Sequence, residues 1–386
     1  MSDTSEGWGS QGLNLGDELF QGADRVKSFA DDSGWATTPS APSAPVSPEP
    51  ASRAAGSDLA ESRRRLGAAR AQLLQTSEGA PVVEPAQWGA RAVLRRSSGG
   101  LLRPGAGKAE RAYQADLEVI RRFQWPGPFS VLVANKKGGV GKTPTCLLLA
   151  GVLAYVRTGG VVALEGADAA GTLALRAERS QESVRGISEL LAEFARIRTA
   201  ANLAWFTQLQ SSGAAVLGSI SDRTTLDESH VRALRRLLDQ YYAINVVDTG
   251  NNPEASAFLQ CIDGADVLVL PTVLSTGSVV SLIDTLYRVR GELPRGELLA
   301  DNAVVIVTDD GRSVDAKEAA RLRGALDELE LGAVVDVPFD PHIAAGNEIS
   351  LGRLSQASQR AWVRATAQVV TCASNLLPHL NLGRTH

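Results

Sequence analysis

Residues 137–143 read Lys-Gly-Gly-Val-Gly-Lys-Thr, and this heptapeptide constrains the fold more than any other feature of the chain. It follows an apolar run at 129–134 that is typical of a buried strand, and it precedes an apolar run at 146–150 that is typical of a buried helix. In such a strand-loop-helix unit, glycines let successive backbone N–H groups point inward, and the helix N-terminus adds the positive end of its dipole. The sequence therefore predicts a loop that binds phosphate groups.

Lysine is scarce in this chain, with six lysines against 33 arginines, yet three of the six lysines lie between residues 136 and 142. In the predicted loop, Lys142 is expected to reach the β- and γ-phosphates of a nucleotide, and the Thr143 hydroxyl is expected to hold Mg²⁺. The backbone around the phosphates would come from the residues between the two signature lysines, which are Gly138, Gly139, Val140 and Gly141.

Strand-like and helix-like segments alternate from residue 109 onward, which is typical of a parallel sheet covered by helices on both faces. We expect about seven strands, at 129–134, 161–165, 215–218, 243–248, 267–271, 303–307 and 333–337. The expected helices are 110–123, 142–156, 184–197, 228–241, 277–290, 314–328 and 356–376. The predicted fold class is therefore α/β, a mostly parallel twisted sheet in one P-loop domain at 108–386.

Residues 1–107 have a different composition, rich in Ser, Ala, Pro and Gly, and are predicted to form a disordered tail. Within this tail, residues 58–75 have helical periodicity and carry Arg63, Arg64, Arg65 and Arg70. A short basic helix there could bind an acidic partner, and a solvated linker helix is the alternative. We expect the tail to dock a protein partner.

The chain has 39 basic and 43 acidic residues, so no overall positive charge favours nucleic acid. Binding of DNA would therefore require a local basic patch, and two clusters are candidates: Arg288, Arg290 and Arg295, or Arg353, Arg360 and Arg364. Arginines on solvent-exposed helix faces are the better explanation of both clusters. No apolar stretch reaches the roughly 18 residues of a membrane span, and residues 1–17 lack the apolar core of a signal peptide. The prediction is a cytoplasmic protein without an integral membrane segment.

Residues 244–249 read Ile-Asn-Val-Val-Asp-Thr, an apolar run that ends in a carboxylate. Beside a phosphate-binding loop, Asp248 would support Mg²⁺ through its water shell, so Thr143 and Asp248 are the predicted metal site. Asn251 and Asn252 follow at once, and either amide could sense the terminal phosphate or form a turn.

The common G-x-x-x-x-G-K-[ST] pattern is not matched, because Lys136 stands at its first glycine. The form that is matched resembles the deviant P-loop of the MinD/ParA superfamily, and the resemblance covers residues 127–345. It implies ATP and Mg²⁺ as cofactors, ATP hydrolysis as the activity, and an ATP-dependent homodimer in which Lys137 reaches the partner subunit's nucleotide. It also implies that Pro338 and Asp340, in a loop after the last strand, contact the adenine.

Three positions depart from the family's pattern. In 165–173, which is similar to the family's first switch loop, Glu165 and Ala167 stand where the family has aspartates, and Asp168 could take over the placing of the attacking water. Pro144 stands where the family usually has Ser or Thr, and proline has neither a hydroxyl nor an N–H. The resemblance therefore implies ATP binding with slow hydrolysis, and the predicted catalytic residues are Lys137, Lys142, Asp168 and Asp248.

The long tail and the segment 162–173 look closest to actinobacterial MinD-like ATPases, some of which are associated with type VII secretion. We expect an ATP-dependent dimerisation switch that positions a partner, in chromosome or plasmid partitioning or in type VII secretion. The alternative is a nucleotide-binding scaffold that does not hydrolyse ATP, and phosphate release distinguishes the two. A metabolic P-loop enzyme similar to dethiobiotin synthetase is a third class, which turnover dependent on a small molecule would reveal.

Overall fold

A computed structural model describes residues 105–178, 185–221, 223–292 and 295–382, together with a few isolated residues between 88 and 102. The chain divides into two units at residues 82 and 83, and the described residues belong to the second unit. The disorder predicted for most of the tail, and the basic helix predicted at 58–75, lie outside the described residues.

An eight-stranded sheet forms the centre of this unit, in the order β3-β4-β2-β5-β1-β6-β7-β8. All neighbouring strands pair in parallel except β3 and β4, which form an antiparallel edge. The strands are β1 (Phe129–Val133), β2 (Val161–Glu165), β3 (Gln208–Leu209), β4 (Ala215–Leu217), β5 (Ile244–Asp248), β6 (Val267–Thr272), β7 (Val304–Thr308) and β8 (Ala333–Val337). The α/β prediction is confirmed with all seven expected strands, and the additional β3 spans too few residues for a detectable apolar pattern.

Alternate residues of the central strands face opposite sides of the sheet. Val131 and Val133 of β1 belong to one apolar core, whereas Leu132 belongs to the core on the other face. Because both faces are covered, all residues of β1 are buried, and the strand reads as a continuous apolar run instead of an alternating one.

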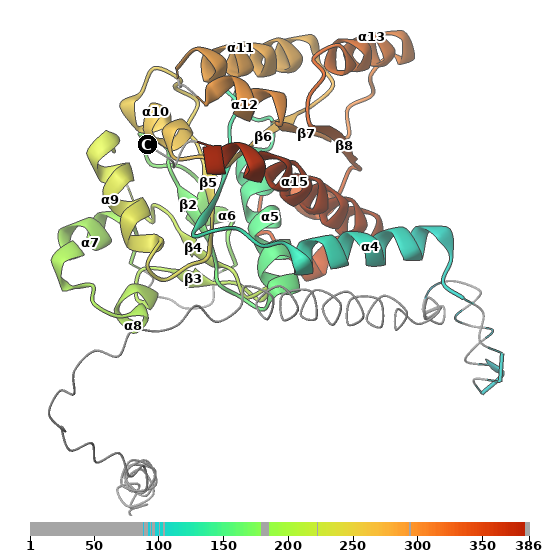
Figure 1. Ribbon diagram of the computed structural model, residues 1–386, viewed down its shortest axis with the longest axis horizontal. Helices are drawn as coiled ribbons and strands as arrows, with labels where there is room; N and C mark the ends of the chain where they lie inside the picture. Colours follow the sequence, from blue (N-terminus) through green and yellow to red (C-terminus); the bar gives the residue numbers. More distant parts are fainter. Residues whose placement is uncertain are drawn as a thin grey trace, which may run out of the picture. The chain divides into compact units, whose positions relative to one another are not determined.

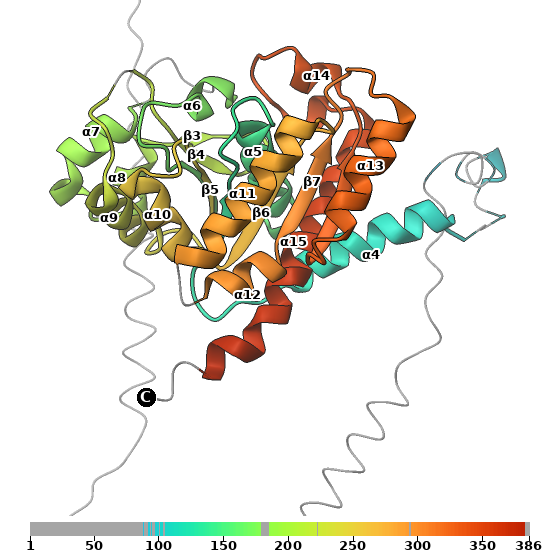
Figure 2. The same cartoon turned by 90° about the horizontal axis from the view of Figure 1, so that it is seen from above.

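Two layers of helices cover the sheet, as Figure 2 shows from above. One layer contains α4 (Lys108–Arg122), α5 (Lys142–Arg157) and α15 (Gln356–Leu382), and α4 lies along α15 in Figure 1. The longer helices of the other layer are α9 (Glu228–Leu238), α10 (Ser256–Asp263), α11 (Thr276–Glu292) and α13 (Ala316–Asp327). Short elements complete the described fold: α6 (Leu173–Arg176), α7 (Ile187–Ala192), α8 (Ala200–Ala204), α12 (Gly296–Asp301), α14 (Pro341–Ala344) and the 3₁₀ turns η1 (Phe194–Arg196) and η2 (Leu351–Arg353).

The continuous helix predicted at 184–197 is wrong. The chain forms α7, leaves the helical conformation at Glu193, and makes the 3₁₀ turn η1 before Thr199 starts α8 by accepting a hydrogen bond from the backbone N–H of Asn202. Glu193 has φ −107° and ψ 13°, outside the α-helical region, so the break lies within the predicted helix, and Thr199 caps a separate short helix beyond it. The other six expected helices are present with shifted ends, and none of the described helices is long and apolar enough to cross a membrane.

The carboxyl ends of β1, β2 and β5 meet at one edge of the sheet. Asp248, the last residue of β5, pairs in register with Val133 of β1 on one side and with Glu165 of β2 on the other. The chain runs from β1 to β2 on one side of β1, and after β5 it continues to β6 on the other side, so the loop after β1 opens at a topological switch point. Ligands of parallel α/β sheets bind at such points.

Candidate nucleotide-binding site

The loop after β1 turns sharply into helix α5. Gly139 and Gly141 have φ angles of 76° and 91°, in the left-handed region that glycine adopts without strain. Helix α5 begins directly afterwards at Lys142, with Pro144 in its first turn, where the missing N–H leaves no helical hydrogen bond unmade. The predicted strand-loop-helix unit is thus present, with the N-terminus of a helix of 16 residues behind the glycines.

A cleft of about 620 Å³ opens beside this loop, and we call it the P-loop cleft. Its walls come from the start of α5, the loop after β2 and the loop after β5. Among the predicted site residues, those that line it are Gly139, Gly141, Lys142, Thr143, Pro144, Asp168 and Asp248. Its volume lies in the range that small-molecule sites occupy.

Lys142 is buried in the wall of this cleft, with 8% of its surface exposed. Its Nζ donates a hydrogen bond to the carbonyl oxygen of Lys137 at 2.9 Å and another to the side-chain carbonyl of Asn251. Burial lowers the pKa of Lys142 to about 8, although the nearby Asp248 carboxylate opposes that shift. An ammonium buried against neutral oxygens favours the approach of an anion.

Asp248 and Thr143 lie side by side at the floor of the cleft. The Thr143 hydroxyl donates to Asp248 Oδ2 at 2.6 Å, whereas Asp248 Oδ1 is buried without a hydrogen-bond partner. Burial raises the pKa of Asp248 to about 7, more than the Thr143 hydrogen bond and the Lys142 charge lower it. A hydroxyl and a carboxylate with one unpartnered oxygen fit the all-oxygen ligand set of Mg²⁺.

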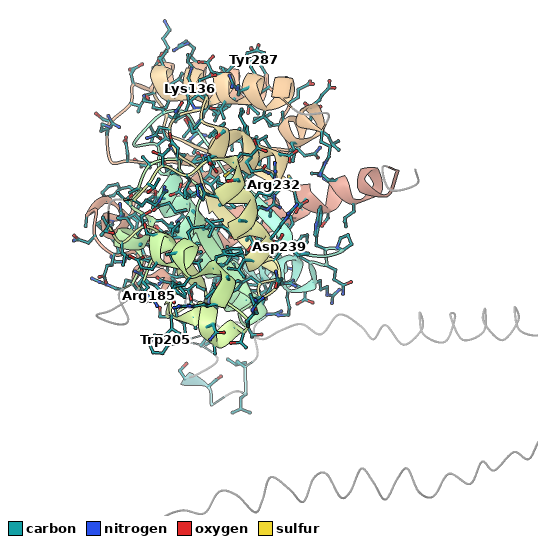
Figure 3. All side chains as sticks on the ribbon, turned by 90° about the vertical axis from the view of Figure 1, so that its left-hand side faces the viewer. Lys136, Arg185, Trp205, Arg232, Asp239 and Tyr287 are labelled. Atoms are coloured by element: carbon teal, nitrogen blue, oxygen red, sulfur yellow. The ribbon has the colours of Figure 1, made fainter. Side chains whose placement is uncertain are left out.

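Lys136 and Lys137 turn toward helix α11 instead of lining the P-loop cleft. Lys137 Nζ donates to the Ser278 hydroxyl at 3.0 Å, and Lys136 forms an ion pair with Asp284; Figure 3 shows Lys136 beside this helix. Lys137 and its neighbour Gly138 are absent from the described lining of the cleft. The role of Lys137 toward a partner subunit therefore stays a prediction.

The loop after β2 brings Asp168 to the same cleft as Lys142, Thr143 and Asp248. The Asp168 carboxylate accepts a hydrogen bond from Asn252 Nδ2 at 3.4 Å, and Asp168 Oδ1 lies 3.0 Å from where a Cβ on Gly250 would stand. The neighbouring Ala167 also lines the cleft, but it offers only a methyl group. Of the two residues, Asp168 is the one that can accept a proton or orient a water.

Sequence reasoning noted Glu165 as a departure from the family's pattern, but it missed the partner of this carboxylate, Arg223. Glu165 lines the cleft but directs its carboxylate to the protein itself, accepting from the backbone N–H of Gly171 at 3.0 Å and pairing with Arg223 at 3.4 Å. Both side chains of this pair are 1% exposed. Arg223 lies 58 residues after Glu165, and no local pattern marks it.

A second pocket, of about 270 Å³, adjoins the P-loop cleft, because Gly139, Gly141 and Pro144 line both. We call it the β8 pocket, since the loop after β8 forms its outer wall. Its other described lining residues are Val140, Val273, Thr308, Asp309, Asp310, Val337, Pro338, Phe339, Asp340, Ile343, Ala344 and Trp362.

Pro338 and Asp340 thus line the same pocket, but the Asp340 carboxylate is used within the protein. It accepts from the backbone N–H of His342 at 2.9 Å, which caps α14, and from the backbone N–H of Ser355 at 2.9 Å. Asp340 therefore shapes the pocket through its backbone and its cap. Sequence reasoning missed the aromatic residues Phe339 and Trp362, which come from a turn and from α15.

No model of a known protein family matches this sequence. Among curated proteins, the chain is similar to the ESX-1 secretion-associated protein EspI of Mycobacterium tuberculosis, found in two strains, with 26% identity over 260 residues. The match covers 65% of this chain and 38% of that protein. The matched part is therefore well under half the length of this relative.

Among solved structures, the chain is similar to a Cyanothece McdA variant in complex with ATP, at 18% identity and a TM-score of 0.46, covering 64% of this chain and 98% of that one. It is also similar to a ParA family ATPase from Chlorobium tepidum, at 15% identity and a TM-score of 0.46, covering 66% and 99%. The MinD cell division protein of Aquifex aeolicus has 15% identity and a TM-score of 0.46, with 63% and 97% covered. The chain, which carries the P-loop residues 137–143, is thus similar to MinD, ParA and McdA proteins and to an ESX-1 secretion-associated protein.

Proposed function

We propose that this protein is a MinD/ParA-like ATPase, which binds ATP with Mg²⁺ and hydrolyses it slowly to ADP and phosphate. The observation that supports this most strongly is the meeting of Lys142, Thr143 and Asp248 in one cleft, at the start of α5 and the end of β5. Lys142 offers a buried cation, and the other two offer an oxygen pair with one unpartnered acceptor. A nucleotide triphosphate with its metal supplies the complements of both.

In this proposal, Lys142 exchanges its hydrogen bonds to Lys137 and Asn251 for bonds to phosphate oxygens. The backbone N–H groups of the glycine loop and of the first turn of α5 bind the same phosphates. Thr143 and Asp248 would hold Mg²⁺, which neutralises charge on the phosphates when it is bound. These contacts place the triphosphate along the P-loop cleft, with the base in the β8 pocket.

Asp168 would orient the attacking water from the loop after β2 and accept the proton that this water loses. The oxygen of that water forms a bond to the γ-phosphorus while the bond to the bridging oxygen breaks, so that ADP leaves and inorganic phosphate is released. Ala167 and Pro144 supply no polar side-chain group to this reaction, which is why the proposed turnover is slow.

The biological role that we propose is an ATP-dependent homodimer in the cytoplasm, in which Lys137 reaches the partner subunit's nucleotide and the N-terminal tail docks a protein partner. The similarity to an ESX-1 secretion-associated protein favours a role in type VII secretion over chromosome or plasmid partitioning. Three of the six arginines considered for DNA binding are in ion pairs, which also disfavours partitioning. Arg290 pairs with Asp301 at 2.6 Å, and Arg364 pairs with Asp116 at 2.8 Å, so their charges are already partly neutralised.

A nucleotide-binding scaffold without turnover is the second candidate. The observation that favours it is the shortage of free polar side chains in the cleft. Ala167 offers only a methyl group, and the Glu165 carboxylate is held by Arg223. Asp168, one residue after Ala167, is then the carboxylate left to act on a water. A scaffold would bind ATP and respond to it without releasing phosphate.

Phosphate release with ATP and Mg²⁺, measured for the wild type beside Asp168→Asn, tests the proposal, while light scattering follows the molecular mass with ATP, ADP and no nucleotide. We expect slow release, a doubled mass with ATP, and a loss of turnover on the order of 100-fold in Asp168→Asn with little change in ATP affinity. ATP binding without phosphate release would make the scaffold the correct function.

A further inference from the structure

The Arg223 side chain makes an unusual set of contacts to the loop after β2. Its Nη2 donates to the carbonyl oxygen of Ala167 at 2.7 Å and to that of Ala169 at 3.0 Å. Its Nη1 donates to the carbonyl oxygen of Asp168 at 2.7 Å. One guanidinium therefore holds three consecutive backbone carbonyls.

The rest of the guanidinium is anchored behind the loop. Its Nε donates to the Ser219 hydroxyl at 2.7 Å, and its Nη2 lies 3.4 Å from the Glu165 carboxylate. The planar fork of arginine has five N–H groups in fixed directions, and the two on Nη2 are shared among the carbonyl oxygens of Ala167 and Ala169 and the Glu165 carboxylate. The ammonium of a lysine has three donors and no such fork, so lysine could not replace it contact for contact.

These contacts fix the direction of the Asp168 side chain. The carbonyl oxygens of Ala167 and Asp168 belong to the two peptide planes that flank the Asp168 Cα atom, and Arg223 holds both. The backbone N–H of Leu226 donates to the same Asp168 carbonyl at 2.8 Å. With both planes held, φ and ψ of Asp168 are set, and so is the direction in which its carboxylate leaves the backbone toward the P-loop cleft.

Glu165, the partner of Arg223 in the ion pair, holds the C-terminal end of the loop, at Gly171 and Leu173. Glu165 accepts from the backbone N–H of Gly171 at 3.0 Å and from that of Leu173 at 3.4 Å, and it also accepts from the Ser219 hydroxyl. The segment between Glu165 and Leu173 is thus tied at its start, middle and end to one buried pair. This pair lies behind the loop and leaves Asp168 facing the cleft.

We propose that Arg223 is a positioning residue for the reaction, which holds the backbone at 167–169 so that Asp168 stays in the cleft that Lys142 and Asp248 also line. This inference rests on the proposed ATP hydrolysis. Arg223 contacts neither the nucleotide nor the metal in this account, so its loss should lower turnover without weakening ATP binding. Because it acts through Asp168, its effect should disappear when Asp168 is already disabled.

The test compares Arg223→Lys, Asp168→Asn and the double variant in phosphate release and in ATP affinity. Arg223→Lys keeps a cation beside Glu165, so it avoids an unpaired buried carboxylate. We expect its kcat to fall about tenfold, with the ATP dissociation constant within about threefold of wild type. The double variant should be no slower than Asp168→Asn alone. The matched control is Arg232→Lys on α9, which contacts Glu228 and Gln260 instead of the loop after β2 and should keep wild-type turnover.

Additive losses in the double variant, or an unchanged kcat in Arg223→Lys, would overturn the inference. If the wild type binds ATP but releases no phosphate, the proposed hydrolysis fails, and hydrogen exchange then decides the positioning. The amides of Gly171, Leu173 and Leu226 should exchange at least about tenfold faster in Arg223→Lys than in Arg232→Lys, because the guanidinium no longer holds the Glu165 carboxylate and the Asp168 carbonyl to which they donate. Equal exchange in the two variants would contradict any hold of Arg223 on this loop.

Discussion

Two sets of buried opposite charges lie at the same edge of the sheet, and they differ in how they are satisfied. Glu165 and Arg223 contact each other at 3.4 Å and are surrounded by hydrogen bonds to the loop after β2. Lys142 donates to neutral oxygens, and one carboxylate oxygen of Asp248 has no partner. Burial lowers the pKa of Lys142 to about 8 and raises that of Asp248 to about 7, so the fold disfavours the charged form of each.

The difference separates charges that hold the fold from charges that await a ligand. A satisfied pair contributes to the structure, and removing one partner leaves the other buried and uncompensated. An unsatisfied charge lowers the stability of the ligand-free protein, and its benefit comes when the ligand binds. Substitutions in the two sets should therefore change stability in opposite directions.

The largest expected loss of stability is in Glu165→Ala, which leaves the buried Arg223 guanidinium without its carboxylate and frees the amides of Gly171 and Leu173. We expect the free energy of unfolding to fall by about 3–5 kcal/mol in urea denaturation. The matched control is Glu228→Ala, which removes an exposed carboxylate paired with Arg232 on α9 and should leave the denaturation curve unchanged. A loss in Glu165→Ala no larger than in the control would remove the contrast between the two sets.

A smaller loss is expected in Gly166→Ala, at the start of the same loop. A Cβ at this position would lie 2.7 Å from both Cys261 Sγ and Val247 Cγ1, so the loop or the strand beneath it must shift. We expect a loss of about 1–3 kcal/mol in the free energy of unfolding. Gly324→Ala is the control, because that helical glycine has open space around it; it should stabilise the protein by about 0.5–1 kcal/mol. A neutral Gly166→Ala would show that this loop is not tightly packed.

The opposite sign is expected in Asp248→Asn, measured without nucleotide or Mg²⁺. Because burial raises the pKa of Asp248 from 3.8 to about 7, the folded protein binds this proton more tightly than the unfolded chain does. The stability that this carboxyl contributes is full below about pH 4 and is lost as pH rises through about 7. Asparagine does not titrate, so the variant should exceed wild type by on the order of 1–3 kcal/mol above pH 7, and the gap should close toward pH 4. A gap that does not depend on pH would argue against a raised pKa.

The two sets of charges also differ in how far they could be predicted from the sequence. The P-loop is encoded locally, since the glycines, Lys142 and Thr143 lie within one heptapeptide between a strand and a helix, and the buried strands read as apolar runs. The hold on the loop after β2 is not local, because Arg223 meets Glu165 across 58 residues and only the folded chain brings them together. The same holds for Trp362, which reaches the β8 pocket from α15. Local patterns predict where phosphates would bind, whereas the walls around them depend on contacts between distant segments.

Binding of ATP with Mg²⁺ to the wild type and to Lys142→Ala, measured by isothermal titration calorimetry, tests the central claim most directly. We predict that the variant binds ATP at least about 100-fold more weakly, because it loses the buried cation that charge-assisted hydrogen bonds to phosphate require, and that it unfolds no more easily than wild type. Lys317→Ala, at an exposed position of α13, should bind as the wild type does. Equal affinity of wild type and Lys142→Ala, or no ATP binding by the wild type, would contradict the assignment of this cleft as a nucleotide site.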